Sequence, residues 1–272
     1  MRLGCCGELD QAGEIREAGF DFLEVNVQKV LRGDEPSATW DATAPDPAKL
    51  LLPIEAANCL VPASKPIIGP ARDFTGLQDY MQRVAKRAQQ LGLRTLVFGS
   101  GAARKRPDGV DEHTADVHLR EFTRMAGEVC AHHRINLAIE HLHAPESNTI
   151  NNLSQARELC EAVHHPNVTT LVDCYHFAIE REPDQYLLNL GDSLTHVHIS
   201  EPVKRAQPFA HGSSKDAYDL HHFFCLLRKI GYDGPISIEA HWTQPIAQIG
   251  AQVAAQLRET WEQAGRCESE ND

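Results

Sequence analysis

The sequence lacks the features that mark several classes of protein. No apolar run approaches the roughly 20 residues that a membrane-spanning helix needs, and residues 1–7 lack the apolar stretch of a secretory signal. These absences predict a cytoplasmic protein with no membrane partner. The eight cysteines include no C-x-x-C pair, so a cysteine-rich zinc site is not expected and reduced thiols are the default.

Basic residues are also scarce relative to acidic ones. The chain has 26 Lys and Arg against 38 Asp and Glu, which gives a net charge of −12. A surface this acidic repels phosphate backbones on average, and we therefore expect no nucleic-acid partner. The stretch Arg104-Lys105-Arg106 is the obvious candidate for a local basic patch.

The pattern that is present alternates apolar, strand-like runs with helix-like stretches along all 272 residues. Eight such βα units predict an α/β protein with a single (β/α)₈ TIM barrel over 1–266 and a polar tail over 267–272. A doubly wound open sheet is the competing architecture. It normally carries a glycine-rich phosphate loop after the first strand, and Cys5-Cys6-Gly7-Glu8 is not one. The expected strands are 2–6, 20–27, 54–61, 93–98, 135–142, 168–174, 194–200 and 235–240, and the expected helices are 10–18, 46–52, 73–91, 111–133, 152–164, 184–190, 219–230 and 246–265.

Four potential metal ligands lie near the ends of the last four expected strands, one on each: Glu140, Asp173, His198 and Glu239. In a (β/α)₈ barrel the active site lies at the carboxyl ends of the strands. A single glutamate at a strand end is usually a capping or salt-bridging residue. All four together favour one divalent cation, because three carboxylates in one apolar mouth would otherwise repel each other. The donor set suits Mn²⁺, which we favour, or Mg²⁺, Co²⁺ or Zn²⁺.

Alternation along the strands supports a shared inward direction for these side chains. In the run 194–200, His196 and His198 point to one side while Val197 and Ile199 point to the other. The runs 135–142 and 235–240 alternate in the same way. Polar or small residues are therefore expected to face the barrel axis and apolar residues to face the helices.

With these residues in place, the chain resembles the xylose-isomerase-like barrel superfamily of sugar-phosphate isomerases and epimerases, especially its ketose 3-epimerases. The resemblance spans nearly the whole chain and is strongest from 135 to 242. It rests on Ile139-Glu140 followed by Glu146, on Asp173-x-x-His176, on His198-Ile199-Ser200-Glu201 and on Ile238-Glu239. It places the metal ligands on the same four residues and implies that His176 and Glu146 contact the substrate. Dimers or tetramers are common in that family, so the resemblance leaves a homo-oligomer open.

One position departs from the family pattern. The epimerases have an arginine six residues after the metal-binding histidine, where this chain has Lys204 followed by Arg205. Lysine is a point charge and cannot reproduce a bidentate contact. We expect Lys204 and Arg205 to contact distal hydroxyls or a phosphate of the substrate. His141, His143 and His241 supply more imidazole than the epimerase pattern needs, and the sequence leaves their roles open.

The resemblance implies a metal-dependent isomerase or epimerase acting on a sugar or keto-sugar. Glu140 and Glu239 would be the catalytic residues, one removing and one returning a proton through a metal-stabilised enediolate. Three alternatives stay open. A lyase or dehydratase acting on a keto-sugar or keto-inositol would share the four ligands. An abasic-site DNA endonuclease would need more histidine ligands, and a sugar-binding protein would keep only a relic of the site.

Overall fold

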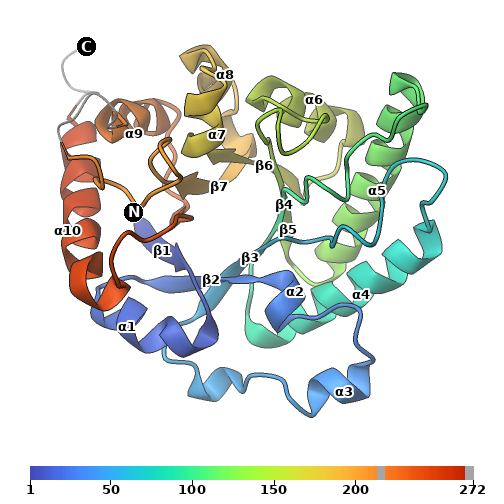
Figure 1. The fold of residues 1–272 in the computed structure, drawn as a ribbon, viewed down its shortest axis with the longest axis horizontal. Coiled ribbons are helices and arrows are strands. Elements are labelled where there is room, and N and C mark those ends of the chain that lie inside the picture. The colour runs from blue at the N-terminus through green and yellow to red at the C-terminus, as the bar shows by residue number, and fades with distance from the viewer. Residues whose placement is uncertain (213–217, 267–272) are drawn as a thin grey trace.

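Eight parallel strands form a closed barrel in the computed structural model, which describes residues 1–212 and 218–266 (Figure 1). Each strand pairs with the next along the chain, and β8 pairs with β1 to close the ring. The predicted barrel is therefore confirmed, and the open sheet is excluded. The strands are β1 Arg2–Cys6, β2 Phe22–Asn26, β3 Ile54–Asn58, β4 Thr95–Phe98, β5 Asn136–Glu140, β6 Val168–Asp173, β7 Leu194–Ile199 and β8 Pro235–Ile238.

Helices surround the barrel on its outside (Figure 1). Where the sequence predicts a helix over 46–52, the structure has only a 3₁₀ turn at Pro47–Lys49. Three short helices, α2, α3 and α7, were not predicted. The α-helices of the described residues are α1 Ala12–Glu17, α2 Val27–Val30, α3 Ser37–Asp41, α4 Phe74–Leu91, α5 Glu112–His132, α6 Leu153–Val163, α7 Cys174–Ile179, α8 Asp184–Leu188, α9 Leu220–Lys229 and α10 Ile246–Ala264.

Alternation along the strands divides the buried residues into an outer and an inner set. On β5, Leu137 and Ile139 belong to the main core between the barrel and the helices. Ala138 points the other way and forms a small separate cluster with Val97 of β4 and Leu171 of β6. The predicted inward direction of alternate residues on β5 is thus confirmed, and it is the direction that Glu140 shares.

The floor of the barrel interior depends on a glycine. Gly4 of β1 pairs with Phe22 of β2, and a Cβ atom at position 4 would lie 2.2 Å from the Phe22 ring. The missing side chain lets the ring fill the interior beneath His196, whose ring centroid lies 6.5 Å from that of Phe22. The polar residues above this floor therefore occupy the carboxyl-terminal half of the barrel.

Arg104 is buried and does not contribute to a basic surface patch. Its Nη1 atom donates to the carbonyl oxygens of Phe98, at 3.1 Å, and Glu140, at 2.8 Å. These contacts tie the end of β4 to the end of β5, so the guanidinium supports the backbone that carries Glu140. Lys105 and Arg106 follow it in the same loop, and Arg106 donates to the carbonyl oxygen of Val110.

Within the described ranges, no helix combines the length and the apolar character needed to cross a membrane. The predicted polar tail, 267–272, lies outside the described residues.

Candidate metal centre

The four predicted ligands meet at the carboxyl-terminal mouth of the barrel. Glu140 and Asp173 are the last residues of β5 and β6, and His198 is the penultimate residue of β7. Glu239 directly follows β8, which ends one residue earlier than the ligand, and its backbone N–H donates to the carbonyl oxygen of Ile199. One ligand atom from each of the four residues lies within 4.8 Å of the others.

His198 is the central member of this group. Its Nδ1 atom lies 2.9 Å from Glu239 Oε2 and 3.3 Å from Glu140 Oε1. Asp173 is fully buried, and its Oδ1 atom accepts a hydrogen bond from the backbone N–H of Tyr175 at the start of α7. Its Oδ2 atom lies 3.6 Å from His176 Nε2. Glu140 and Glu239 therefore contact the imidazole directly, and Asp173 adds a third carboxylate within the 4.8 Å group.

The charges of the cluster shift the pKa values of its members. Burial raises the pKa of Glu140 above its usual value. Burial acts in the same direction on Glu239, but Arg205 and His198 outweigh it and hold the pKa of that carboxyl below its usual value. Glu24 and Glu239 raise the pKa of the His198 imidazole well above its ordinary value, although burial opposes them. The cluster is therefore an anionic site with a strong demand for positive charge.

Arg205 supplies part of this positive charge. Its Nη2 atom lies 2.5 Å from both Asp173 Oδ2 and Glu239 Oε2, and its guanidinium stacks 4.7 Å from the centroid of the Tyr175 ring. Lys204 is exposed, and no contact joins it to the four ligands in the described part of the chain. Of the two basic residues predicted to contact the substrate, the structure thus brings Arg205 into the site and leaves Lys204 at the surface.

The backbone around Arg205 is held in an unusual conformation. Lys204 and Arg205 both have positive φ angles, 57° and 47°, which non-glycine residues rarely adopt. The carbonyl oxygen of Arg205 accepts from the backbone N–H of His241 at 2.7 Å, and Ala206 forms an isolated parallel bridge with the same residue. The side chain of His241 is exposed. Its backbone therefore anchors the Arg205 loop to the segment that follows Glu239.

His176 and Glu146, which the family resemblance implies to be substrate contacts, lie beside the cluster. The His143 backbone N–H donates to His176 Nδ1 at 3.2 Å, which leaves the ring proton on Nε2. This buried Nε2 atom has no hydrogen-bond partner among the described residues, and it lies 3.6 Å from Asp173 Oδ2 and 4.0 Å from Glu146 Oε2. Burial, followed by the charge of Arg205, lowers the pKa of His176, so the ring is neutral. It can donate one hydrogen bond into the site.

The remaining histidines have other partners. His141 is buried with Nε2 at 3.0 Å from Glu182 Oε1, and His143 Nδ1 lies 3.0 Å from His176 Nδ1. His196 lies inside the barrel with Nε2 at 2.7 Å from Glu24 Oε2. His143, Glu146 and His176 also form a group of metal-ligating type, but His176 Nδ1 already accepts a backbone hydrogen bond.

Two polar residues of the site escaped the sequence-based prediction. Glu24 of β2 is fully buried and contacts both His196 and His198. Asn58 ends β3, and its Nδ2 atom donates to Glu239 Oε1 at 2.9 Å. The available signal was a polar side chain near the end of an otherwise apolar strand, which is the same signal that identified Glu140.

A cavity of about 370 Å³ opens over the cluster. Gly99 directly precedes Ser100 and Gly101 of its lining, and a Cβ atom at position 99 would come 2.1 Å from Glu140 Oε2, so glycine leaves room for this carboxylate. The lining combines polar residues with small or apolar ones. Its lining consists of Gln28, Asn58, Cys59, Val61, Ala63, Ser100, Gly101, Ala102, Glu140, Leu142, Glu146, His176, Arg205 and Glu239.

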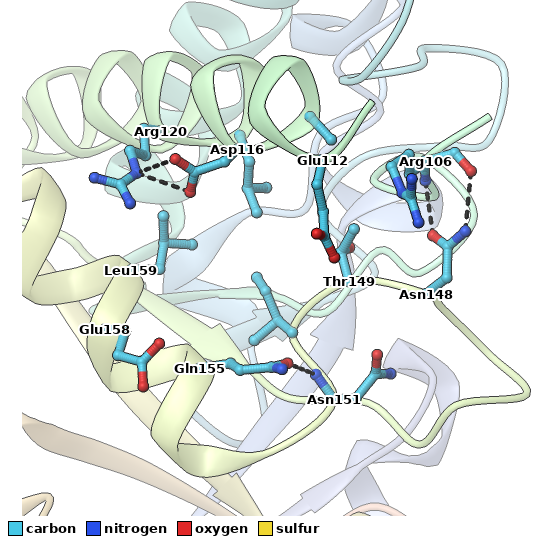
Figure 2. Close-up of a pocket in the computed structure, with 13 residues that line it drawn as sticks. Arg106, Glu112, Asp116, Arg120, Asn148, Thr149, Asn151, Gln155, Glu158 and Leu159 are labelled. Carbon is cyan, nitrogen blue, oxygen red and sulfur yellow. Dashed lines mark hydrogen bonds and ion pairs between the residues drawn. The ribbon is translucent and has the colours of Figure 1, made fainter. Parts of the chain in front are cut away.

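A second cavity, of about 250 Å³, lies outside the barrel between α5 and α6 (Figure 2). Asn148 there pairs with the backbone of Arg106 in both directions, accepting from its N–H and donating to its carbonyl oxygen. Arg120 pairs with Asp116. The pairing of Asn148 with Arg106 ties the segment after β5, which includes Glu146, to the loop after β4, whereas the Arg120–Asp116 pair lies within α5. The four candidate ligands are absent from the lining of this cavity.

The chemistry of the donor set fits a divalent cation. Three carboxylates and one imidazole are ligands that Mn²⁺, Mg²⁺, Co²⁺ and Zn²⁺ accept. Buried carboxylates this close together need a positive charge to stay ionised, and Arg205 contacts only two of the three. The residues present therefore fit a divalent metal ion, whose identity the donor set does not select.

Several known proteins are similar to this chain over more than 90% of its length. The chain is 26% identical over 294 aligned positions to the ketose 3-epimerase of Arthrobacter globiformis, and the match covers 96% of the chain and 91% of that protein. Two solved structures share the fold. The 3-keto-D-glucoside 4-epimerase of E. coli has a TM-score of 0.77 at 22% identity and covers 95% of this chain and 99% of its own. An AP endonuclease of family 2 from Brucella melitensis has a TM-score of 0.75 at 19% identity, with 94% and 99% covered.

At these identities the two structures establish the fold alone, and enzymes with different names share it. The family model described as the xylose isomerase-like TIM barrel is more specific to this chain, because it matches residues 13–263. This range includes all four candidate ligands, Glu146, His176 and Arg205. With a closed eight-stranded barrel and a family match over residues 13–263, the chain belongs to the xylose isomerase-like TIM barrel family.

Proposed function

We propose that the protein is a divalent-metal-dependent epimerase or isomerase that acts on a sugar or keto-sugar by proton transfer next to a carbonyl group. The observation that carries this proposal is that two carboxylates reach one imidazole nitrogen from different strand ends. Glu239 Oε2 and Glu140 Oε1 both approach His198 Nδ1, and they come from strands separated by two others. Two bases at one site can act on opposite faces of a substrate carbon.

Each residue of the site has a part in this reaction. A divalent ion held by Glu140, Asp173, His198 and Glu239 would polarise the substrate carbonyl and make the neighbouring C–H more acidic. One of the two catalytic carboxylates, Glu140 or Glu239, takes that proton. The other returns a proton to the opposite face of the same carbon, which gives an epimer, or to the neighbouring carbon, which gives an isomer.

The walls of the site would bind the rest of the substrate. The unpaired Nε2–H of His176 donates to a substrate oxygen, because no described residue accepts from it. Glu146 is partly exposed at the cavity edge and can accept from a hydroxyl group. Two relatives support a sugar substrate, since the A. globiformis protein is a ketose 3-epimerase and the E. coli protein is a 3-keto-D-glucoside 4-epimerase.

Incubation with candidate sugars in deuterated water tests the proposed function. The protein, loaded with Mn²⁺, is mixed with a panel of ketoses and 3-keto-glucosides, and the products are read by mass spectrometry and NMR. We expect an epimer or isomer that has gained one deuterium at the reacting carbon. Loss of water or of an aglycone would instead identify a lyase, and cleavage of abasic DNA would identify an endonuclease.

A pair of substitutions in the Arg205 loop separates the two basic residues of that loop. Arg205→Ala removes the guanidinium from Asp173 and Glu239, and hydrogen bonds to charged groups are worth about 1.5–3 kcal/mol, so we expect kcat/KM to fall by about 10- to 100-fold. Lys204→Ala removes an exposed side chain and should change mainly the affinity for a substrate that reaches it. Steady-state kinetics on the identified sugar measure both.

Arg205→Lys provides the matched control, because it keeps the charge but not the planar fork. We expect it to recover only part of the lost activity. A larger loss of kcat/KM for Lys204→Ala than for Arg205→Ala would contradict the placement of these two residues and assign substrate contact to Lys204.

A further inference from the structure

Glu24 is a fully buried carboxylate that the proposed reaction does not use. It lies on β2 and faces the interior of the barrel, across from β7. Its two oxygens have separate partners: Oε1 lies 2.9 Å from His198 Nε2, and Oε2 lies 2.7 Å from His196 Nε2. One carboxylate thus holds both histidines of the H-x-H pair on β7.

The contact between Glu24 and His198 determines which nitrogen of the His198 ring faces the cluster. A neutral imidazole carries one proton, and an ionised carboxylate can only accept a hydrogen bond. The hydrogen bond to Glu24 therefore keeps the proton on Nε2. The other nitrogen, Nδ1, is the atom that lies 2.9 Å from Glu239 and 3.3 Å from Glu140, so it is the nitrogen that faces the cluster and would bind a cation.

His196 is the second partner of Glu24, and its contacts are not with the three carboxylates of the cluster. Its Nε2 atom lies within hydrogen-bond distance of the second oxygen of Glu24, and Ser237 Oγ lies 3.4 Å from the same nitrogen. Each oxygen of Glu24 therefore lies within hydrogen-bond distance of one imidazole nitrogen, so the carboxylate is placed to accept from both rings.

A purely structural role does not account for a charge at this depth. Burying a carboxylate is costly even when it is paired, and an apolar residue of similar volume often stabilises a protein as well or better. Interior positions on β4, β5 and β6, elsewhere in the barrel, are apolar, namely Val97, Ala138 and Leu171. Glu24, in contrast, places a charged side chain in the interior, next to the candidate metal ligand His198.

We propose that Glu24 is a positioning residue of the metal centre, which fixes the orientation and the proton position of His198 so that Nδ1 faces the cation. This inference rests on the proposed metal site but not on the identity of the substrate. Substitution of a carboxylate that accepts a hydrogen bond from a metal-binding histidine typically lowers metal affinity by about 10- to 100-fold.

Glu24→Gln tests this role because it keeps the shape of the side chain. A glutamine has one oxygen and one NH₂ group, so it cannot accept from both imidazoles. We expect the dissociation constant for Mn²⁺, measured by competition with a fluorescent chelator, to rise by about 10- to 100-fold. The visible absorption spectrum of the Co²⁺-loaded protein should also change, which is a readout independent of turnover.

Glu182→Gln is the matched control. Glu182 is a buried glutamate that lies 3.0 Å from a histidine nitrogen, His141 Nε2, but it contacts none of the four ligands. We expect this variant to keep the wild-type metal affinity, even if the thermal unfolding temperature of the metal-free protein falls. An equal loss of affinity in both variants, or wild-type affinity in Glu24→Gln, would overturn the proposal.

A second variant covers the case in which Glu24→Gln does not fold. Glu24→Asp keeps the negative charge but withdraws the carboxylate by one methylene group, so metal affinity should fall while the fold is kept. Unchanged affinity in this variant would also overturn the role of Glu24. If the wild-type protein binds metal but turns over no sugar, only the proposed function fails; if it binds no metal, both proposals fail.

Discussion

Replacing Glu239 by Gln is expected to abolish turnover and to weaken metal binding in the same protein. Glu239 Oε2 lies 2.9 Å from His198 Nδ1, and Oε1 accepts a hydrogen bond from Asn58. The amide cannot remove a proton, and loss of a general base typically costs about 10²- to 10⁴-fold in rate. Loss of a ligand's charge adds to this effect. Measurement of kcat at saturating Mn²⁺, together with the metal dissociation constant, separates the two contributions.

The control for this variant is again Glu182→Gln, which changes a buried glutamate outside the four ligands. It should keep its metal affinity and most of its turnover. Full activity in Glu239→Gln would contradict the assignment of Glu239 as a catalytic residue. A loss of metal binding with normal turnover at saturating Mn²⁺ would leave Glu239 as a ligand but remove it as a base.

Removal of the metal is expected to eliminate activity and to lower the stability of the fold. The cluster brings three carboxylates together, and Arg205 contacts only Asp173 and Glu239. A bound cation neutralises this repulsion and stabilises the folded state by about 2.7 kcal/mol when its free concentration is 100 times its dissociation constant. Dialysis against a chelator should therefore abolish turnover and lower the thermal unfolding temperature.

Addition of Mn²⁺ should restore both properties with one metal ion per chain, as measured by elemental analysis. Parallel additions of Mg²⁺, Co²⁺ and Zn²⁺ identify which ions support turnover. Full activity after complete chelation would contradict the central hypothesis about this site. Metal well below one ion per chain, in protein purified without a chelator, would count against it as well.

The strands of this barrel are predictable because their signal is local. Each is a short apolar run between turn residues, and all eight predicted strands are present within a few residues of the expected bounds. The short helices α2, α3 and α7 escape prediction because four to six residues are too few to show a helical period. The equally short α8 is predicted because Gly191 marks the end of its run. α2 depends instead on a cap, since the Asn26 side chain accepts from the N–H groups of Gln28 and Lys29.

The departure at Lys204 shows the limit of spacing as a guide. The family pattern places the basic residue six positions after His198, at Lys204, yet it is the next residue, Arg205, that contacts Asp173 and Glu239. Two successive positive φ angles reverse the chain at this point, so the simple count along the sequence does not predict the side-chain direction. The hydrogen bond between His241 N–H and Arg205 O that holds this turn joins residues far apart in the chain.

The sequence by itself determined the barrel and the four candidate ligands, because alternation along a strand and the position of its end are local properties. Only the tertiary structure decided which other charges surround those ligands. Glu24 and His198 are 174 residues apart and meet because closure of the barrel places β2 opposite β7 across a narrow interior. Nothing in the residues next to Glu24 indicates that partner. The four candidate ligands could therefore be predicted from single strands, whereas the contact between Glu24 and His198 required the closed barrel.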